Sequence, residues 1–210
     1  MVNEQHDSTE EKIRAVAKEL FSKQGYNGTT IREVAEQAGV NIALLNYYFR
    51  SKDKLFLSIF SDSFTKFLNI GKTTLLDESI DFLDRIPRFI DEVTALFQEN
   101  PQLPIFVLSE CNHNPDVNSM LADIKAQSKK DLMHQLDKVL QAEYEKGNIR
   151  KISALHLDFL LGSQIILPFL TLPILKQVHH LEGKKLDGFL KEIKEISKEM
   201  IVTYLKSGRS

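Results

Sequence analysis

A cluster of hydrogen-bonding, apolar and cationic side chains lies between Asn41 and Lys54. Asn46 carries an amide that can hydrogen-bond a base edge or a phosphate, and Tyr47 carries a hydroxyl that can reach a phosphate. Ile42 and Ala43 are apolar groups that can contact the methyl group of thymine. Positive charge follows at Arg50, Lys52 and Lys54. Together these groups have the chemistry needed to contact a DNA duplex.

Helical periodicity separates these side chains onto two faces. If residues 42–49 form an α-helix with about 3.6 residues per turn, they divide into two halves. One half holds Ile42, Ala43, Asn46 and Tyr47, and the other holds Leu44, Leu45, Tyr48 and Phe49. We expect the first half to face the major groove, which admits a helix and displays the base edges. For Tyr48, a core position and a phosphate contact both remain open.

The residues before this helix have the spacing of a helix-turn-helix motif. With Ile31 as the first position, Ala35 falls where two helices cross, and a larger side chain there would push them apart. Gly39 falls at the turn, where a left-handed backbone is favourable only without a Cβ. The apolar filling between the helices is Val34, Ala38, Val40 and Leu45. Several conditions met at fixed offsets are more specific than an isolated glycine motif.

Polar residues at the predicted helix starts are further candidate DNA contacts. Thr30 and Glu33 have the spacing of a capping box. Thr30 and Arg32 are candidate contacts, with a purely structural cap and a solvated position as their respective alternatives. Asn41 is a candidate contact just before the second motif helix. Ser51 can cap a third helix that begins at Lys52, and the free N–H groups at this helix start favour a phosphate.

This N-terminal stretch resembles the DNA-binding domain of the TetR family of bacterial transcriptional regulators. The matching segments are AKELFSKQGYNGTTIREVAEQAGV and LNYYFRSKDKLF. The resemblance implies an all-α homodimer, a palindromic operator and usually repression that a small ligand relieves. It also implies phosphate contacts by Tyr47, Tyr48 and Lys52. The position before the paired tyrosines is commonly tyrosine in that family, whereas here it is Asn46, which favours a shorter contact or a base contact.

The rest of the chain also has the apolar periodicity of helices, without the alternation of strands. A capping box at Ser8 and Glu11 predicts the start of the first helix, and Gly25 predicts its end. We predict an all-α protein, with a three-helix helix-turn-helix head joined to a larger helical body for ligand binding and dimerisation. The predicted boundaries are 8–55 for the DNA-binding head, 56–75 for a connecting helix and 76–206 for the body.

Composition and charge narrow the class of protein. A net charge of −2 does not favour a general nucleic-acid coat or a polybasic membrane protein. Cys111 is the single cysteine, which excludes an internal disulfide and predicts a reducing, cytoplasmic location. The N-terminal residues are unlike a signal peptide. Phe159–Leu175 is uncharged, but it is short for a membrane span and contains Pro168 and Pro173, so we expect a buried or interfacial helix.

The body has more aromatic and apolar residues than DNA reading requires, which predicts a pocket for a small apolar or amphipathic ligand. Cys111 and His113, with His179 and His180, have only weak metal-ligand spacing, so neither a metal nor a cofactor is predicted. The candidate lining residues are Phe89, Phe106, Cys111, Met133, His134, Phe159 and Gln164.

Two C-terminal apolar segments predict a homodimer. Leu155–Leu175 and the stripe from Leu186 to Tyr204 would form a four-helix bundle with the same helices of a second copy. On this prediction, a lysine at Ile165 or Ile193 would give a monomer or an aggregate.

These patterns favour a sequence-specific transcriptional regulator, a repressor that binds a near-palindromic operator and is released by a small ligand. The alternative is a structural or protein-recruiting DNA-binding protein without a small-molecule inducer. The two differ in whether any small molecule lowers operator affinity. An enzyme is disfavoured, because the sequence contains no phosphate-cradling glycine loop, nucleophile elbow or paired acid and base at catalytic spacing.

Overall fold

The structure is a computed structural model that describes residues 2–101, 103–104 and 115–207. Every regular element in these residues is a helix, so the predicted all-α class is confirmed. None of the described helices is both long enough and apolar enough to cross a bilayer. Among the described residues, one compact unit holds 2–65, 100–101, 103–104 and 115–119, and the other holds 66–99 and 120–207, so the first division falls between Thr65 and Lys66. That division lies inside the connecting helix predicted for 56–75, and the predicted three-part boundaries stay a prediction.

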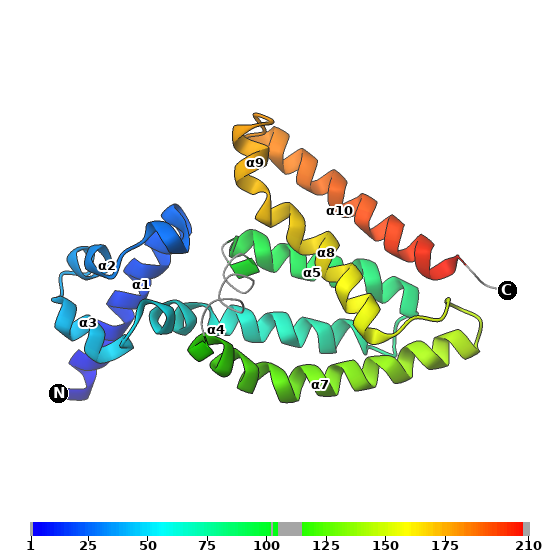
Figure 1. The fold of residues 1–210 in the computed structure, drawn as a ribbon, viewed down its shortest axis with the longest axis horizontal. Coiled ribbons are helices and arrows are strands. Elements are labelled where there is room, and N and C mark those ends of the chain that lie inside the picture. Colours follow the sequence, from blue (N-terminus) through cyan, green and yellow to red (C-terminus); the bar gives the residue numbers. More distant parts are fainter. Residues whose placement is uncertain (1, 102, 105–114, 208–210) are drawn as a thin grey trace. The chain divides into compact units, whose positions relative to one another are not determined.

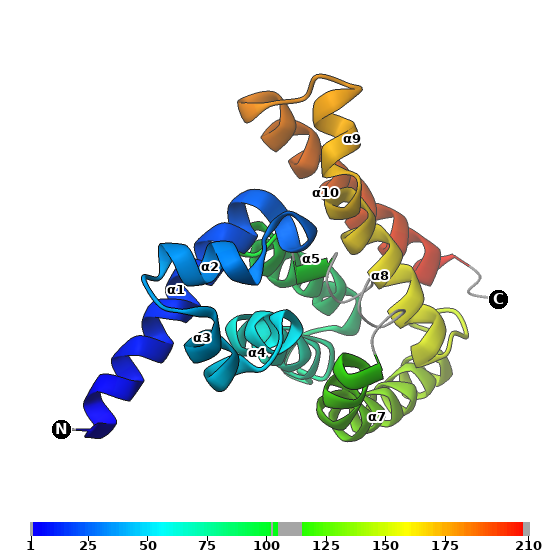
Figure 2. The same ribbon diagram turned by 60° about the vertical axis from the view of Figure 1, so that its left-hand side comes forward.

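The first unit contains the helix-turn-helix. It is built from α1 (Val2–Gly28), α2 (Ile31–Gln37), α3 (Ile42–Phe49) and the first part of α4 (Lys52–Ile70). Helix α2 packs against both α1 and α3, as Figures 1 and 2 show. The residues buried among these helices include Ile13, Phe21, Val34, Ala35, Leu45 and Phe56. The crossing position predicted for Ala35 is therefore part of the core.

The bounds of α1 differ from the sequence prediction. The helix begins at Val2 and not at the capping box of Ser8, so that predicted start is wrong. Glu4 and Gln5 are good helix formers, which allows the helix to continue upstream. Gly25 has φ 76° and ψ 171°, so the helix is broken there as predicted, and one further helical turn follows.

Side chains cap the helices of the first unit. The Thr30 hydroxyl accepts from the Glu33 N–H at 3.1 Å, and the Ser51 hydroxyl accepts from the Lys54 N–H at 3.2 Å. These two contacts confirm the predicted caps, because each satisfies an N–H group that the helix itself leaves unpaired. Gly39 has φ 65° at the turn between α2 and α3, which confirms the need for glycine at that position.

The second unit is a helical body. It contains the end of α4, a π-helix η1 (Gly71–Leu75), α5 (Phe82–Glu99), α7 (Pro115–Glu145) from Met120 onward, α8 (Ala154–Leu170), α9 (Leu172–Gln177) and α10 (Gly183–Lys206). Helix α10 packs against α5 and α8, which also pack against each other. The Phe97 ring of α5 stacks on Phe67 of α4 and meets Phe169 of α8 edge-on. The core of the body includes buried residues of α5, α8 and α10 and Leu132, Leu136 and Leu140 of α7.

The apolar segment predicted as one continuous helix is broken in the structure. Helix α8 ends at Leu170 and α9 begins at Leu172, so the prediction for Leu155–Leu175 is wrong in this respect. Pro173 explains the break, because proline has no N–H to donate and its ring clashes with the carbonyl of the residue four positions earlier. Proline is tolerated in the first turn of a new helix, and Pro173 lies in the first turn of α9.

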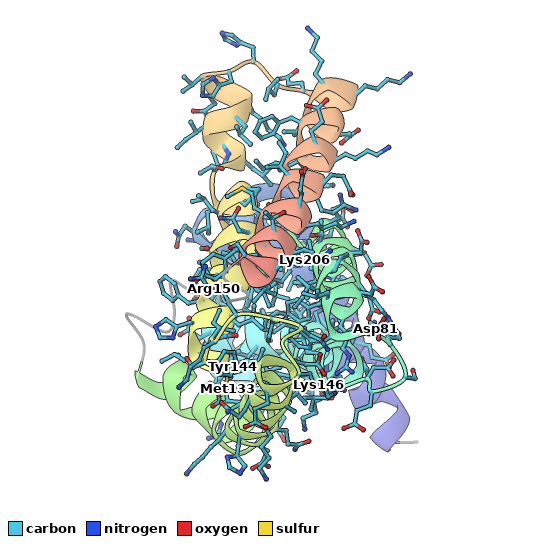
Figure 3. The ribbon with its side chains drawn as sticks, turned by 90° about the vertical axis from the view of Figure 1, so that its right-hand side faces the viewer. Asp81, Met133, Tyr144, Lys146, Arg150 and Lys206 are labelled. Atoms are coloured by element: carbon cyan, nitrogen blue, oxygen red, sulfur yellow. The ribbon has the colours of Figure 1, made fainter. Side chains whose placement is uncertain are left out.

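The loop between α7 and α8 holds the C-terminal end of α10. The Arg150 N–H donates to the Leu205 carbonyl at 2.8 Å, and the Arg150 guanidinium lies 4.2 Å from the centroid of the Tyr204 ring. Figure 3 looks at this end of the body and labels Arg150 and Lys206 on the adjoining segments. The loop therefore fixes the end of the helix through both backbone and side-chain contacts.

Candidate nucleic-acid interface and ligand cavity

Helix α3 separates into an exposed and a packed face as predicted. Tyr47 is 73% exposed and Ile42 is 44% exposed, and Ala43 and Asn46 are exposed beside them. On the opposite face Leu45 and Phe49 are buried, while Leu44 and Tyr48 are half-buried. Tyr48 is half-buried, so its side chain is neither fully inside the core nor fully exposed to solvent. The contacts of these residues with DNA stay predictions.

The candidate contacts at the helix starts have defined positions. Thr30 and Asn41 are the N-caps of α2 and α3, and the Asn41 Oδ1 accepts from the Leu44 N–H at 2.7 Å. Capping uses the oxygen of the Asn41 side chain and leaves its amide N–H groups as donors. Arg32 is exposed on α2. All three residues lie in or next to the two helices of the motif.

Lys52 is positioned by an aromatic side chain that the sequence analysis did not identify as functional. Its ammonium lies 4.2 Å from the centroid of the Tyr26 ring, and the Tyr26 hydroxyl donates to the carboxylate of Asp53. The same ring stacks on Phe21 and meets Phe56 edge-on. A half-buried aromatic ring thus holds the first turn of α4. The residues lie far apart in sequence, so periodicity could not connect them.

Arg50 and Lys54, two cationic residues that follow α3, differ in backbone conformation. Arg50 is exposed and has φ 61° and ψ −39°, which is unusual for a residue with a Cβ. Its N–H donates to the Asn46 carbonyl at 2.9 Å and ends the helix. Lys54 is exposed in the first turn of α4. Arg50 therefore presents a positive charge from a backbone position that usually favours glycine.

The body contains a small, partly enclosed cavity of about 40 Å³. Two of the predicted lining residues, Phe89 and Met133, line it. The described residues around it are Phe67, Leu68, Gly71, Leu75, Phe89, Leu132, Met133, Leu136, Asp158 and Leu161. They come from α4, η1, α5, α7 and α8, so the wall is built by five elements of one unit.

Three other predicted lining residues lie elsewhere. The Gln164 side-chain oxygen accepts from the Ser197 hydroxyl at 3.3 Å between α8 and α10. His134 lines a separate open groove beside the loop before α8, and Phe159 is 77% exposed. The expectation that Phe159 lines an interior pocket is corrected, because α8 is apolar on opposite faces and periodicity could not identify the inner one. Phe106 and Cys111 lie outside the described residues.

Within the described part of the chain, no group of three or more histidine, cysteine or acidic side chains is arranged to bind a metal ion. The candidate pair Cys111 and His113 lies outside it.

Helices α8 and α10 each expose an apolar stripe. On α8 the stripe is Leu155, Phe159 and Leu167, and on α10 it is Ile196, Met200 and Tyr204. Both stripes repeat at four-residue intervals or multiples of them, which corresponds to one face of a helix. Ile165, chosen from the sequence as an interface residue, is only 5% exposed, so it belongs to the core of the body.

Comparison with known proteins identifies the N-terminal domain. Residues 13–59 match the family model described as bacterial regulatory proteins, tetR family. The probable HTH-type transcriptional regulator YttP of Bacillus subtilis is 30% identical over 106 residues, covering 49% of this chain and 50% of YttP. The HTH-type transcriptional repressor NicS of Pseudomonas putida is 36% identical over 107 residues, covering 46% of this chain and 50% of NicS. The chain thus spans about half the length of these relatives.

Solved structures extend the similarity to the whole fold. The hemolysin II transcriptional regulator HlyIIR has a TM-score of 0.61 at 22% identity, covering 96% of this chain and 99% of that chain. The Bacillus subtilis regulator FadR, solved in complex with stearoyl-CoA, has a TM-score of 0.63 at 16% identity, covering 92% of this chain and 98% of that chain. At these identities the likeness concerns the fold. The match over residues 13–59 leads to one assignment: the N-terminal domain of this chain is that of the tetR family of bacterial regulatory proteins.

Proposed function

We propose that this protein is a DNA-binding transcriptional regulator, a repressor whose affinity for a near-palindromic operator is lowered by a small apolar or amphipathic ligand. The observation that carries the proposal is α3, which exposes Ile42, Asn46 and Tyr47 while it buries Leu45 and Phe49. A helix with such a face fits the major groove. A regulator of this kind acts in the cytoplasm, where the bacterial chromosome lies, and needs no catalytic activity.

The proposed DNA contacts divide into two classes. Ile42, Ala43 and Asn46 would read base edges, because they lie on the exposed face of α3. The remaining residues would contact phosphates and fix the register of the helix in the groove. They are Thr30, Arg32, Asn41, Tyr47, Tyr48, Lys52 and Lys54.

The apolar stripes of α8 and α10 support a homodimer as the DNA-binding species. An exposed stripe such as Leu155 and Phe159 on α8 is costly to leave in water at about 25 cal/mol per Å² of apolar surface. A two-fold axis would pair these stripes with those of a second copy in a four-helix bundle. Two heads would then meet two half-sites of a near-palindromic operator.

The cavity beside Phe89 and Met133 supports a ligand-controlled switch. Its wall includes Gly71 and Leu75 of η1 and Phe67 of α4. Helix α4 also carries Lys52 in its first turn. A ligand that moves the cavity wall would therefore act on the same helix that contributes a proposed phosphate contact, and it would favour whichever conformation it binds better.

The salt dependence of operator binding tests the DNA-binding role. Lys52→Ala should weaken binding to all sequences and reduce the slope of log K against log salt by about 0.9. Asn46→Ala should lower affinity only at particular base positions if it reads an edge. Lys184→Ala on α10 is the matched control and should leave the slope unchanged. Wild-type binding to its own promoter no tighter than to random DNA would refute the proposal.

Sedimentation tests the dimer. Phe159→Lys and Met200→Lys each put a charge in an apolar stripe and should yield monomers at micromolar concentration. Gln98→Lys, on the exposed surface of α5, adds the same charge outside both stripes and should remain dimeric. Wild-type protein that sediments as a monomer would exclude this interface. Operator titration with ligands found by thermal-shift screening tests the switch, and binders that never change DNA affinity would favour a structural role instead.

A further inference from the structure

The cavity in the body is apolar except at one position. Among the described residues that line it, Asp158 alone carries a charged side chain. The carboxylate lies on α8 next to Leu157 and one turn before Leu161, both of which are buried. Asp158 is itself half-buried. Among the described lining residues it is the charged group that a polar group of a ligand can meet.

The rest of the described lining can accommodate an apolar stem. It contains the aromatic rings of Phe67 and Phe89 and the thioether of Met133. A volume of about 40 Å³ holds about one water molecule, so a larger occupant must open the cavity. Met133 has an unbranched side chain that adapts its shape to an occupant. The site thus combines a deformable apolar wall with one hydrogen-bond acceptor.

We propose that the effector is a lipophilic amine, an apolar molecule with one protonated nitrogen that donates to Asp158. This inference rests on the proposed function of the cavity as the effector site. An ionised carboxylate accepts hydrogen bonds and does not donate them. Its hydrogen bond to a cation is roughly twice as strong as one between neutral groups. An anionic head group would be repelled by the like charge.

A ligand amine can bind Asp158 even though this carboxylate already has a partner within the protein. The two oxygens of Asp158 offer about four acceptor positions, so the side chain can keep a contact within the protein while it binds a ligand N–H. Selectivity should therefore follow the order amine, alcohol, carboxylate for ligands with the same apolar stem.

Three probes with the same six-carbon stem test this order. Hexylamine, hexan-1-ol and hexanoate are titrated into the full chain by calorimetry at neutral pH, without DNA. Wild-type protein should bind hexylamine about tenfold more tightly than hexan-1-ol, with hexanoate weakest. Asp158→Asn should lower the affinity for hexylamine about tenfold and leave hexan-1-ol unchanged within about twofold. Asp158→Glu should keep the preference for the amine.

A matched variant separates the local contact from net charge. Asp187→Asn removes the same charge from an exposed position on α10 and should bind all three probes as the wild type does. Thermal unfolding of each variant checks that the body is folded. Tighter binding of hexanoate, an unchanged amine preference in Asp158→Asn, or no binding of hexylamine to the wild type would each overturn the proposal.

Operator binding is measured separately with hexylamine present. Amine-selective binding that depends on Asp158 but leaves operator affinity unchanged would support the ligand class and overturn the role of the cavity as a switch. Calorimetry therefore tests the class of ligand, and operator binding separately tests whether the cavity acts as a switch.

Discussion

The ammonium of Lys52 lies over the face of the Tyr26 ring, 4.2 Å from its centroid. The aromatic face attracts the cation and holds it at the start of α4, where the free N–H groups also favour an anion. The cation and the helix terminus together would form a preorganised position for the phosphate that Lys52 is proposed to contact. This arrangement links a half-buried aromatic residue of α1 to the proposed DNA contact.

Tyr26→Leu should lower operator affinity by about 0.5–1 kcal/mol, because Lys52 loses the ring that orients it. Tyr26→Phe keeps the ring and should retain operator affinity, although it loses the hydrogen bond to Asp53. The decisive measurement is a double-mutant cycle, in which Tyr26→Leu has little further effect on affinity once Lys52 is alanine. Purely additive losses would mean that Tyr26 acts on stability alone.

Arg50→Gly should stabilise the first unit and weaken DNA binding. The backbone of Arg50 has φ 61°, and relieving such a conformation gains about 1 kcal/mol. The lost charge should reduce the salt slope of operator binding by about 0.9. Arg50→Ala is the control, because it loses the charge but keeps the strained conformation. Equal unfolding midpoints for the glycine and alanine variants in urea would contradict the strain argument.

Gly71→Ala should destabilise the body by about 1–3 kcal/mol. A Cβ at Gly71 would lie 2.9 Å from Cδ2 of the buried Leu132, so the wall of the cavity must shift. Gly162→Ala on α8 is the matched control, since its Cβ would meet only Ile166 Cδ1 at 4.0 Å. Gly162→Ala should raise the free energy of unfolding by roughly 0.5–1 kcal/mol, because alanine is more favourable than glycine in a helix interior. Urea unfolding that gives both variants the same sign would refute this contrast.

An ion-pair cluster between α5 and α10 should make stability depend on pH. The Asp91 carboxylate accepts from the ammonium groups of Lys194 and Lys198, both at 2.7 Å. Partial burial raises the pKa of Asp91, but the hydrogen bonds from the two lysines outweigh this and lower it. The stabilisation is therefore complete above the unfolded pKa of about 3.9 and is lost as the pH falls through the lower folded value.

Asp91→Asn should accordingly lower the free energy of unfolding by about 0.5–1 kcal/mol at neutral pH, because the cluster is partly exposed and screened. The difference from the wild type should shrink below about pH 4 as Asp91 is protonated. Asp84→Asn, at an exposed position of the same helix, serves as the control. Urea denaturation at neutral and acidic pH measures both effects, and a constant difference across that range would contradict the assignment.

Local chemistry explains what could be predicted from the sequence. The caps at Thr30 and Ser51 and the turn at Gly39 depend on residues within one helical turn, so short patterns identify them. The two faces of α3 follow from periodicity alone. The exposure of Phe159 could not be predicted, because α8 is apolar on opposite sides. The pairing of Tyr26 with Lys52 depends on how α1 and α4 meet, which no local pattern encodes.

The π-helix η1 affects which changes of length the sequences of related proteins can tolerate. Its hydrogen bonds span one residue more than those of an α-helix, so losing one residue from Gly71–Leu75 could be absorbed by a return to α-helical geometry. The same deletion inside α3 would turn its exposed side chains by about 100°. Gly71 and Leu75 also line the cavity. Single-residue length changes at η1 would therefore let related proteins diverge in ligand preference while their DNA-reading helices stay the same.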